Sequence, residues 1–212
     1  MLSKYFKINY LIILIVILLV EIVFSFSLKE YILNDKFLYN SFAEQMTMEE
    51  VENAVTSVKE SFWLLLLSAV LKVIAEIFLI TLAINLGTLL FEYQITFKQI
   101  FGAVTKAYII FAITRVVLMG IYAYEGVSSL EDLNYIPKLS LFELFDTQSL
   151  PNWAVFPLQI ANLPQLFFIL LTALALNQIR QYGFAKWLLV VLGTYGTGLV
   201  IWTILVTFLV IL

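Results

Sequence analysis

The sequence predicts an all-α integral membrane protein, a helical bundle of five transmembrane helices with short interfacial amphipathic helices. Of its 212 residues, 62% are hydrophobic and 13% are charged, which is about half the charged fraction of a typical soluble domain. The apolar residues form runs long enough to cross roughly 30 Å of hydrocarbon. We expect a single membrane domain over residues 1–212, with spans near 9–27, 61–86, 103–124, 154–177 and 187–211.

The first span follows Lys4 and Lys7 and ends near Ser27. A cleaved signal peptide is the alternative interpretation, because Ser25 and Ser27 form a small-x-small pattern. The apolar run is longer than the hydrophobic part of a signal peptide and carries Glu21 near its middle. We therefore expect an uncleaved transmembrane helix.

Residues 28–60 form the most polar stretch of the chain, which we expect to be an extracytoplasmic loop that ends in a helix. Thr47 and Glu50 have the spacing of a capping box, which predicts a helix start near Met48. Steps of three and four predict one apolar stripe on this helix, made of Met48, Val51, Val55, Val58 and Phe62. The helix is expected to run directly into the second span, and its acidic face to be solvated rather than a cation site.

The second span, near 61–86, is expected to end around Asn85 and Gly87. Thr96 then predicts the start of a short, separate amphipathic helix that lies at the membrane interface. The third span, near 103–124, follows this helix.

The second polar loop, 125–152, contains Ser140, which predicts a capped helical turn in the segment LFELFD. Pro164 is expected to kink or interrupt the fourth span. Asn162 and Gln165 beside it would then either satisfy the freed backbone or line a cavity.

A short basic turn, NQIRQYGFAK at 177–186, joins the fourth and fifth spans. The fifth span contains the patch GTYGTG, whose position inside an apolar run is incompatible with a nucleotide-binding loop. Small residues spaced four apart predict close helix packing in this patch, at Gly193, Gly196 and Gly198.

Lysine and arginine set the orientation of a membrane protein. Six of them lie at the N-terminus, in the 87–106 connection and in the 178–186 turn, with one acid, Glu92. The polar loops 28–60 and 125–152 hold four lysines and twelve acids. We therefore expect a cytoplasmic N-terminus and an extracytoplasmic C-terminus.

Four ionisable residues fall inside predicted spans, namely Glu21, Lys72, Glu76 and Arg115. Glu21 and Arg115 would both lie roughly 16 Å from the cytoplasmic end of their spans, and Lys72 and Glu76 are one helical turn apart. An unpaired charge at such depth costs at least about 2.5 kcal/mol, so the two acids are expected to neutralise the two bases. A structural ionic network is the favoured interpretation, and a proton or ion relay is the alternative.

The chain contains no cysteine and no histidine. This composition excludes disulfides, thiolate metal sites, cysteine nucleophiles and catalysis that depends on histidine. The predicted spans also contain no aspartate pair. We expect no enzymatic activity, no cofactor and no metal, and partners drawn from the lipid bilayer, other membrane proteins or a second copy of the chain, not from nucleic acids.

The segments TFKQIFGAV and NLPQLFFILLTALALNQIRQYGFAKWLLVVL give the chain a resemblance to the Yip family. The second segment is similar to the fourth–fifth hairpin of bacterial members, with a long apolar run, a short turn and a lysine–alanine cadence. The resemblance covers residues of about 60–212 and implies five spans with the N-terminus inside. Eukaryotic members associate with Rab GTPases and with one another in membrane trafficking. This chain has neither their DLYGP-type motif nor their cytosolic N-terminal domain, and Ala175 stands near the place of a common glycine.

The resemblance therefore implies the bacterial type, a multi-pass protein of the cytoplasmic membrane whose members have no assigned function. We expect a membrane scaffold or partner-binding protein without catalytic activity. The alternative is a small permease or a transporter subunit that uses the four intramembrane charges. A transporter requires a hydrated cavity that reaches these charges, whereas a scaffold would bury them in pairs.

Overall fold

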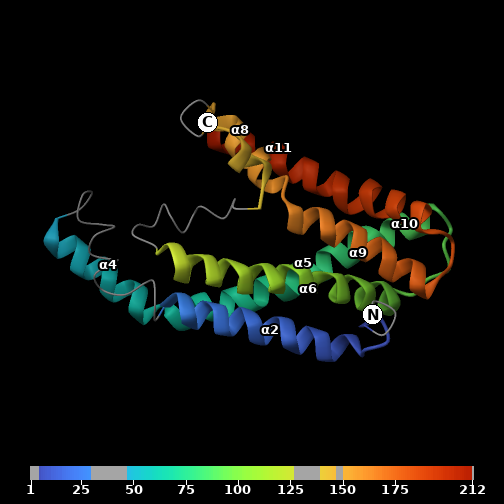
Figure 1. The fold of residues 1–212 in the computed structure, drawn as a ribbon, viewed down its shortest axis with the longest axis horizontal. Coiled ribbons are helices and arrows are strands. Elements are labelled where there is room, and N and C mark those ends of the chain that lie inside the picture. Colours follow the sequence, from blue (N-terminus) through green and yellow to red (C-terminus); the bar gives the residue numbers. More distant parts are fainter. Residues whose placement is uncertain (1–4, 30–46, 127–138, 147–149, 212) are drawn as a thin grey trace. The chain divides into compact units, whose positions relative to one another are not determined.

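The computed structural model describes residues 5–29, 47–126, 139–146 and 150–211, and this part of the chain contains helices and no strand (Figure 1). Its long helices are α2 (Tyr10–Ser27), α4 (Met48–Glu60), α5 (Phe62–Leu90) and α6 (Phe97–Glu125). The C-terminal third contains η2 (Leu141–Leu144), α8 (Asn152–Ile160), α9 (Leu163–Ile179), α10 (Phe184–Val191), η3 (Leu192–Gly196) and α11 (Thr197–Ile211). The predicted all-helical fold is confirmed.

Four helical segments in the described ranges are long and apolar enough to cross a membrane: α2, α5, α6 as far as Tyr124, and the run from Phe184 to Leu209. The predicted fourth span is divided between α8 and α9, and α9 has only 17 residues. The chain therefore has the helices of a membrane protein, and a fifth crossing stays a prediction.

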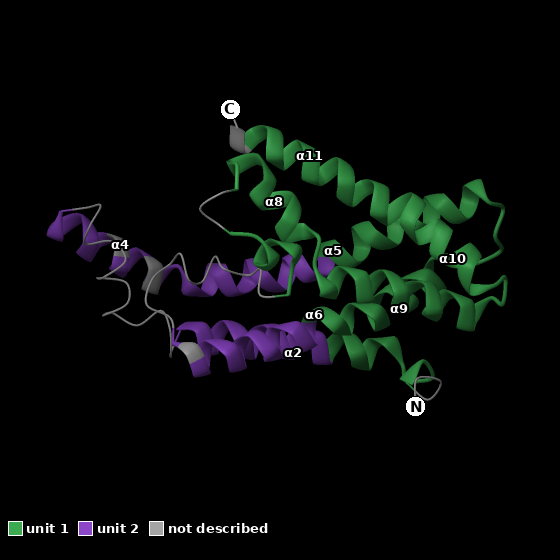
Figure 2. Ribbon diagram, turned by 45° about the horizontal axis from the view of Figure 1, so that its top comes forward, with its two compact units in different colours: residues 1–15, 75–111, 136–212 green, residues 16–74, 112–135 purple. Residues whose placement is uncertain are grey.

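The helices cluster into two compact units (Figure 2). Unit 1 comprises residues 1–15, 75–111 and 136–212, and unit 2 comprises residues 16–74 and 112–135. Each unit has its own buried apolar core, with Ile84, Phe168 and Trp187 in unit 1 and Ile17, Val51 and Leu118 in unit 2.

In unit 1, α10 packs on α9 and α11 packs on α8. The turn between α9 and α10 contains Gly183 at a φ of 104°, a conformation that glycine adopts without strain. The Gly183 N–H donates to Oδ1 of Asn177 at 3.0 Å, and Nε1 of Trp187 donates to the Arg180 carbonyl at 2.8 Å. These bonds fix the short connection predicted for 177–186.

Contacts inside unit 1 also join segments that were predicted to share one side of the membrane. The Tyr5 hydroxyl donates to the Lys106 carbonyl at 2.6 Å, and Nζ of Lys106 donates to the Phe6 carbonyl at 2.7 Å. Burial raises the pKa of Tyr5 to about 12, so its phenol stays protonated and can donate. The Tyr93 ring, in the connection before α6, stacks on Tyr182 with centroids 4.6 Å apart. The N-terminus thus meets the start of α6, and the α5–α6 connection meets the α9–α10 turn.

In unit 2, the predicted capping box at the start of α4 is confirmed. The backbone N–H and the hydroxyl of Thr47 both donate to Oε2 of Glu50, each at 2.8 Å. On the predicted stripe Val51, Val55 and Phe62 are buried, whereas Met48 is 76% exposed because it occupies the first position of the helix. The side chain of Val58 lies outside the described part.

The helix α4 was predicted to run directly into the second span, and the structure bears this out with one slight interruption. The assignment breaks only at Ser61, whose N–H still donates to the Ser57 carbonyl at 2.9 Å. The segments 30–46, 127–138 and 147–149 of the two predicted polar loops lie outside the described residues.

Two predicted boundaries are wrong. The helix α5 does not end at Asn85 or Gly87 but continues to Leu90, and the turn follows at Glu92, which has a φ of 55°. No separate interfacial helix begins at Thr96, because α6 runs without a break from Phe97 to Glu125. The part of α6 that was expected to be separate, residues 97–106, contains no proline. Its glycine, Gly102, packs against the Tyr10 ring and does not break the helix.

Candidate functional site

The intramembrane charges give one ion pair within unit 2. Nε of Arg115 donates to Oε2 of Glu21 at 3.1 Å, and the two side chains are 31% and 11% exposed. The Arg115 guanidinium also lies 5.2 Å from the centroid of the Phe24 ring, one turn further along α2. This contact agrees with the similar depths expected for Glu21 and Arg115 and forms part of the predicted neutralisation of two acids by two bases. A carboxylate and a guanidinium in contact remove most of the cost of placing either charge alone in hydrocarbon.

The carboxylate of Glu76 has a different partner, within unit 1. Oε2 of Glu76 accepts a hydrogen bond from the Tyr108 hydroxyl, and the Tyr108 ring contacts those of Phe111 and Phe168. Sequence reasoning missed Tyr108 because it compared only charged residues. The sequence did offer a signal for this contact. Tyr108 is a phenol in the apolar run of α6, and it lies about as far from the α5–α6 connection as Glu76 does.

Lys72 belongs to unit 2 and its side chain is exposed, whereas Glu76 belongs to unit 1. The contacts described within each unit therefore give two sets, Glu21 with Arg115 and Glu76 with Tyr108. The structure confirms the part of the predicted network that joins Glu21 to Arg115, and the pairing of Lys72 and Glu76 stays a prediction.

The fourth predicted span is interrupted immediately before Pro164, as expected. The helix α8 ends at Ile160, and Asn162 caps α9 by accepting a hydrogen bond from the Gln165 N–H at 2.8 Å. Nδ2 of Asn162 donates to the Gln159 carbonyl at 3.0 Å, so this side chain bonds both sides of the break. The side-chain oxygen of Gln165 accepts from the Tyr195 hydroxyl at 2.6 Å.

Backbone hydrogen bonds also join the break between α8 and α9 to the segment around η2. The Leu141 N–H donates to the Ala161 carbonyl at 2.9 Å, and the Leu163 N–H donates to the Leu139 carbonyl at 2.8 Å. The Ser140 hydroxyl caps η2 by accepting from the Phe142 N–H at 3.3 Å, as its position before LFELFD predicted. Backbone groups freed by the break are thus bonded to η2 instead of being left unsatisfied.

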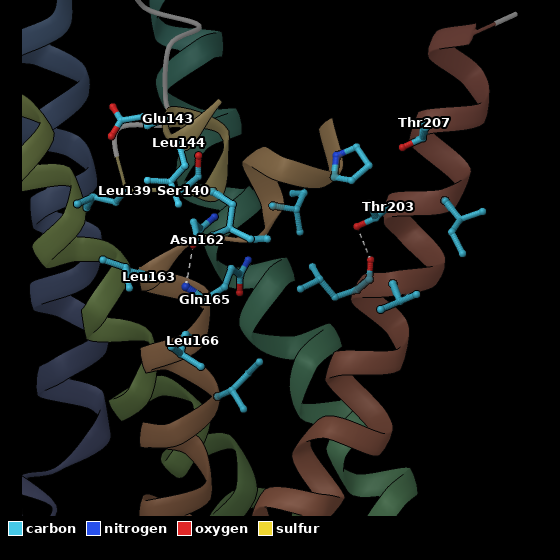
Figure 3. Close-up of a pocket in the computed structure, with 18 of the residues that line it drawn as sticks. Leu139, Ser140, Glu143, Leu144, Asn162, Leu163, Gln165, Leu166, Thr203 and Thr207 are labelled. Atoms are coloured by element: carbon cyan, nitrogen blue, oxygen red, sulfur yellow. Dashed lines mark hydrogen bonds between the residues drawn. The ribbon is translucent and has the colours of Figure 1, made fainter. Parts of the chain in front are cut away.

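A large cavity lies between η2, α8, α9 and α11, and we call it the α8–α11 cavity (Figure 3). Its volume is about 1110 Å³, and its walls are mainly apolar, with Leu166, Ile169 and Val200 among them. Both Asn162 and Gln165 line it, so these residues satisfy the broken backbone and also face a cavity. None of the four intramembrane charges is among its lining residues.

The close packing predicted for the GTYGTG patch occurs at its Thr194, and not at its three glycines. A Cβ placed at Gly193 or Gly198 would meet no described atom within 4 Å, and one at Gly196 would meet only its own helical segment. The close approach occurs at Gly87 instead, where a Cβ would lie 2.3 Å from Cγ2 of Thr194. The region around Gly193 forms the π-helical turn η3, which the sequence patterns did not predict.

Within the described ranges, no three acidic residues come close enough to hold a metal ion. Neither the protein-family models nor the curated proteins nor the solved structures with which the chain was compared give a match.

Proposed function

We propose that this protein is a non-enzymatic, multi-pass protein of the bacterial cytoplasmic membrane, of the Yip type, that works by binding other membrane proteins or lipids. In this proposal the chain crosses the bilayer five times, with α8 and α9 together as the fourth crossing, and its N-terminus is cytoplasmic. The observation that carries the proposal is the Glu21–Arg115 contact at 3.1 Å, which neutralises two intramembrane charges within the fold.

The position of the α8–α11 cavity supports the same proposal. A relay or permease requires its ionisable groups to face the space through which the substrate passes. The residues around this cavity come from positions 139–208, and they include none of the four intramembrane charges. In this proposal the Glu21–Arg115 pair holds helices together, and the cavity is available for a different role.

The alternative is a small permease, favoured by the 31% exposure of the Arg115 side chain. Two measurements on the full chain separate the two functions. Affinity purification in mild detergent identifies proteins and lipids that remain bound, and vesicles of phosphatidylcholine containing the purified chain report proton flux through a pH-sensitive dye.

We expect partners or lipids to copurify at a fixed ratio to the chain, and proton flux to equal that of empty vesicles. The double variant Glu21→Gln/Arg115→Met should retain the same partners, because it removes both charges together. Flux above the empty-vesicle level that Glu21→Gln alone abolishes, in a variant that is still monodisperse, would establish the permease instead.

A further inference from the structure

The α8–α11 cavity has the size and lining of a ligand site. Its volume of about 1110 Å³ lies slightly above the roughly 300–1,000 Å³ typical of small-molecule pockets. Apolar wall residues such as Leu166 and Val200 are 51% and 58% exposed, so the cavity opens to the surroundings of the protein. For a helix that lies in a bilayer, those surroundings are lipid chains.

Polarity changes along the cavity. Glu143 of η2, Trp153 at the start of α8 and Thr207 near the end of α11 line one end of it. Leu166 of α9 lines the opposite end (Figure 3), and Leu199, near the start of α11, is a further apolar wall residue. Tryptophan and polar groups are typical of the membrane interface. The cavity thus has a polar mouth and an apolar interior, which match the polar headgroup and the apolar chains of a phospholipid.

The hydroxyl of Thr207 lacks a partner. Its Oγ1 is buried and makes no hydrogen bond within the described residues. One turn earlier, the Thr203 hydroxyl donates to the Leu199 carbonyl at 2.7 Å, which is the usual arrangement for threonine in an apolar helix. Both threonines line the cavity, and the Thr207 side chain points from α11 toward it (Figure 3). A buried hydroxyl is costly unless it finds an acceptor, and an occupant of the cavity can supply one.

The charge of the mouth restricts which lipid fits. The residues that line the cavity include one acid, Glu143, and no lysine or arginine. Every phospholipid carries a phosphate, so the Glu143 carboxylate distinguishes headgroups by the charge beyond the phosphate and would repel one with a net negative charge. A headgroup whose amine balances the phosphate is complementary to this mouth.

We propose that the α8–α11 cavity binds one bilayer phospholipid with a zwitterionic, amine-bearing headgroup. One acyl chain lies along the wall formed by α9 and α11, an ester carbonyl accepts a hydrogen bond from Thr207, and the amine faces Glu143. This site is independent of the Glu21–Arg115 pair and of any protein partner.

The test uses the full chain in phosphatidylcholine nanodiscs, to which phosphatidylethanolamine or phosphatidylglycerol is added, and counts retained lipids by native mass spectrometry. We expect about one phosphatidylethanolamine per chain and no comparable retention of phosphatidylglycerol. Thr207→Val should weaken retention roughly 2- to 10-fold, the effect of one hydrogen bond. Thr203→Val is the matched control, because its hydroxyl is bonded within α11, and it should retain lipid as the original chain does.

Val200→Trp fills the cavity from an exposed wall position and should abolish retention while the protein stays monodisperse in size-exclusion chromatography. Glu143→Gln should reduce the preference for phosphatidylethanolamine over phosphatidylglycerol. Equal retention of the two lipids by the original chain, equal effects of Thr207→Val and Thr203→Val, or undiminished retention in a folded Val200→Trp variant would each overturn the proposal.

Discussion

Separating Glu21 from Arg115 should destabilise the protein far more than removing both charges together. In Glu21→Gln, the Arg115 guanidinium loses its partner at 3.1 Å, and an unpaired arginine in the centre of a membrane helix costs about 2.5–3.5 kcal/mol. Its remaining contact with Phe24 recovers part of this, so we expect a loss of about 2–3 kcal/mol. In Arg115→Met, the Glu21 carboxylate loses this donor, and we expect a loss of about 1–2 kcal/mol.

The double variant Glu21→Gln/Arg115→Met replaces the pair by neutral side chains of similar size and should lie within about 1 kcal/mol of the original chain. The coupling energy between the two positions is then about 3 kcal/mol. It is measured by reversible unfolding in mixed micelles with increasing sodium dodecyl sulfate, followed by circular dichroism. If the double variant loses the sum of the two single losses, the contact contributes nothing and the reasoning is refuted.

Three further predictions concern single positions. Gly87→Ala should lower the free energy of unfolding by about 1–3 kcal/mol, because the new Cβ would lie 2.3 Å from Cγ2 of Thr194. Adding Thr194→Ser, which removes that methyl group, should restore stability. The control Gly198→Ala should not lower stability, because a Cβ there meets no described atom within 4 Å. Asn162→Ala should cost about 1 kcal/mol through loss of the α9 cap, whereas Asn162→Ser, measured in the same unfolding assay, should retain most of it. The backbone N–H and the hydroxyl of Thr47 lower the pKa of Glu50. The stability that these hydrogen bonds contribute is therefore fully present above the unfolded pKa and is lost as the pH falls through the lower folded pKa. Carboxyl titration by NMR should give a midpoint below that of an unfolded peptide, and an equal midpoint would contradict the prediction.

Features set by neighbouring residues could be predicted from the sequence. The capping box at Thr47, the cap at Ser140 and the helix break before Pro164 each depend on residues within three or four positions of one another. The all-helical architecture followed from apolar runs of membrane-spanning length in the same way. These predictions succeed because local spacing determines which backbone groups a side chain can reach.

Features set by which helix faces which could not be predicted with the same success. The sequence predicted that Glu21 and Glu76 together neutralise Lys72 and Arg115, and the contact between Glu21 and Arg115 agrees with it because charges in hydrocarbon have few possible partners. The partner of Glu76, the Tyr108 phenol, is uncharged and so was absent from the set of charges that was compared. Small-residue spacing predicted close packing at the GTYGTG patch, and the close approach there joins Thr194 to Gly87 of α5 and does not involve the glycines of the patch, because spacing shows which small residues share a face and not which of them meets a neighbour.

The interruption at Asn162 also has a consequence for the membrane around the protein. A helix of 17 residues, the length of α9, spans about 26 Å, which is shorter than the roughly 30 Å hydrocarbon layer of an average bilayer. A helix of 29 residues, the length of α5, spans roughly 44 Å and exceeds it. In the proposed fourth crossing α9 therefore reaches the thickness of the bilayer only with the help of α8, and any mismatch that remains costs fractions of a kcal/mol per Å. Bilayers that are thin or easily deformed near α9 would lower this cost, so lipid chain length should affect where the protein accumulates and how stable it is.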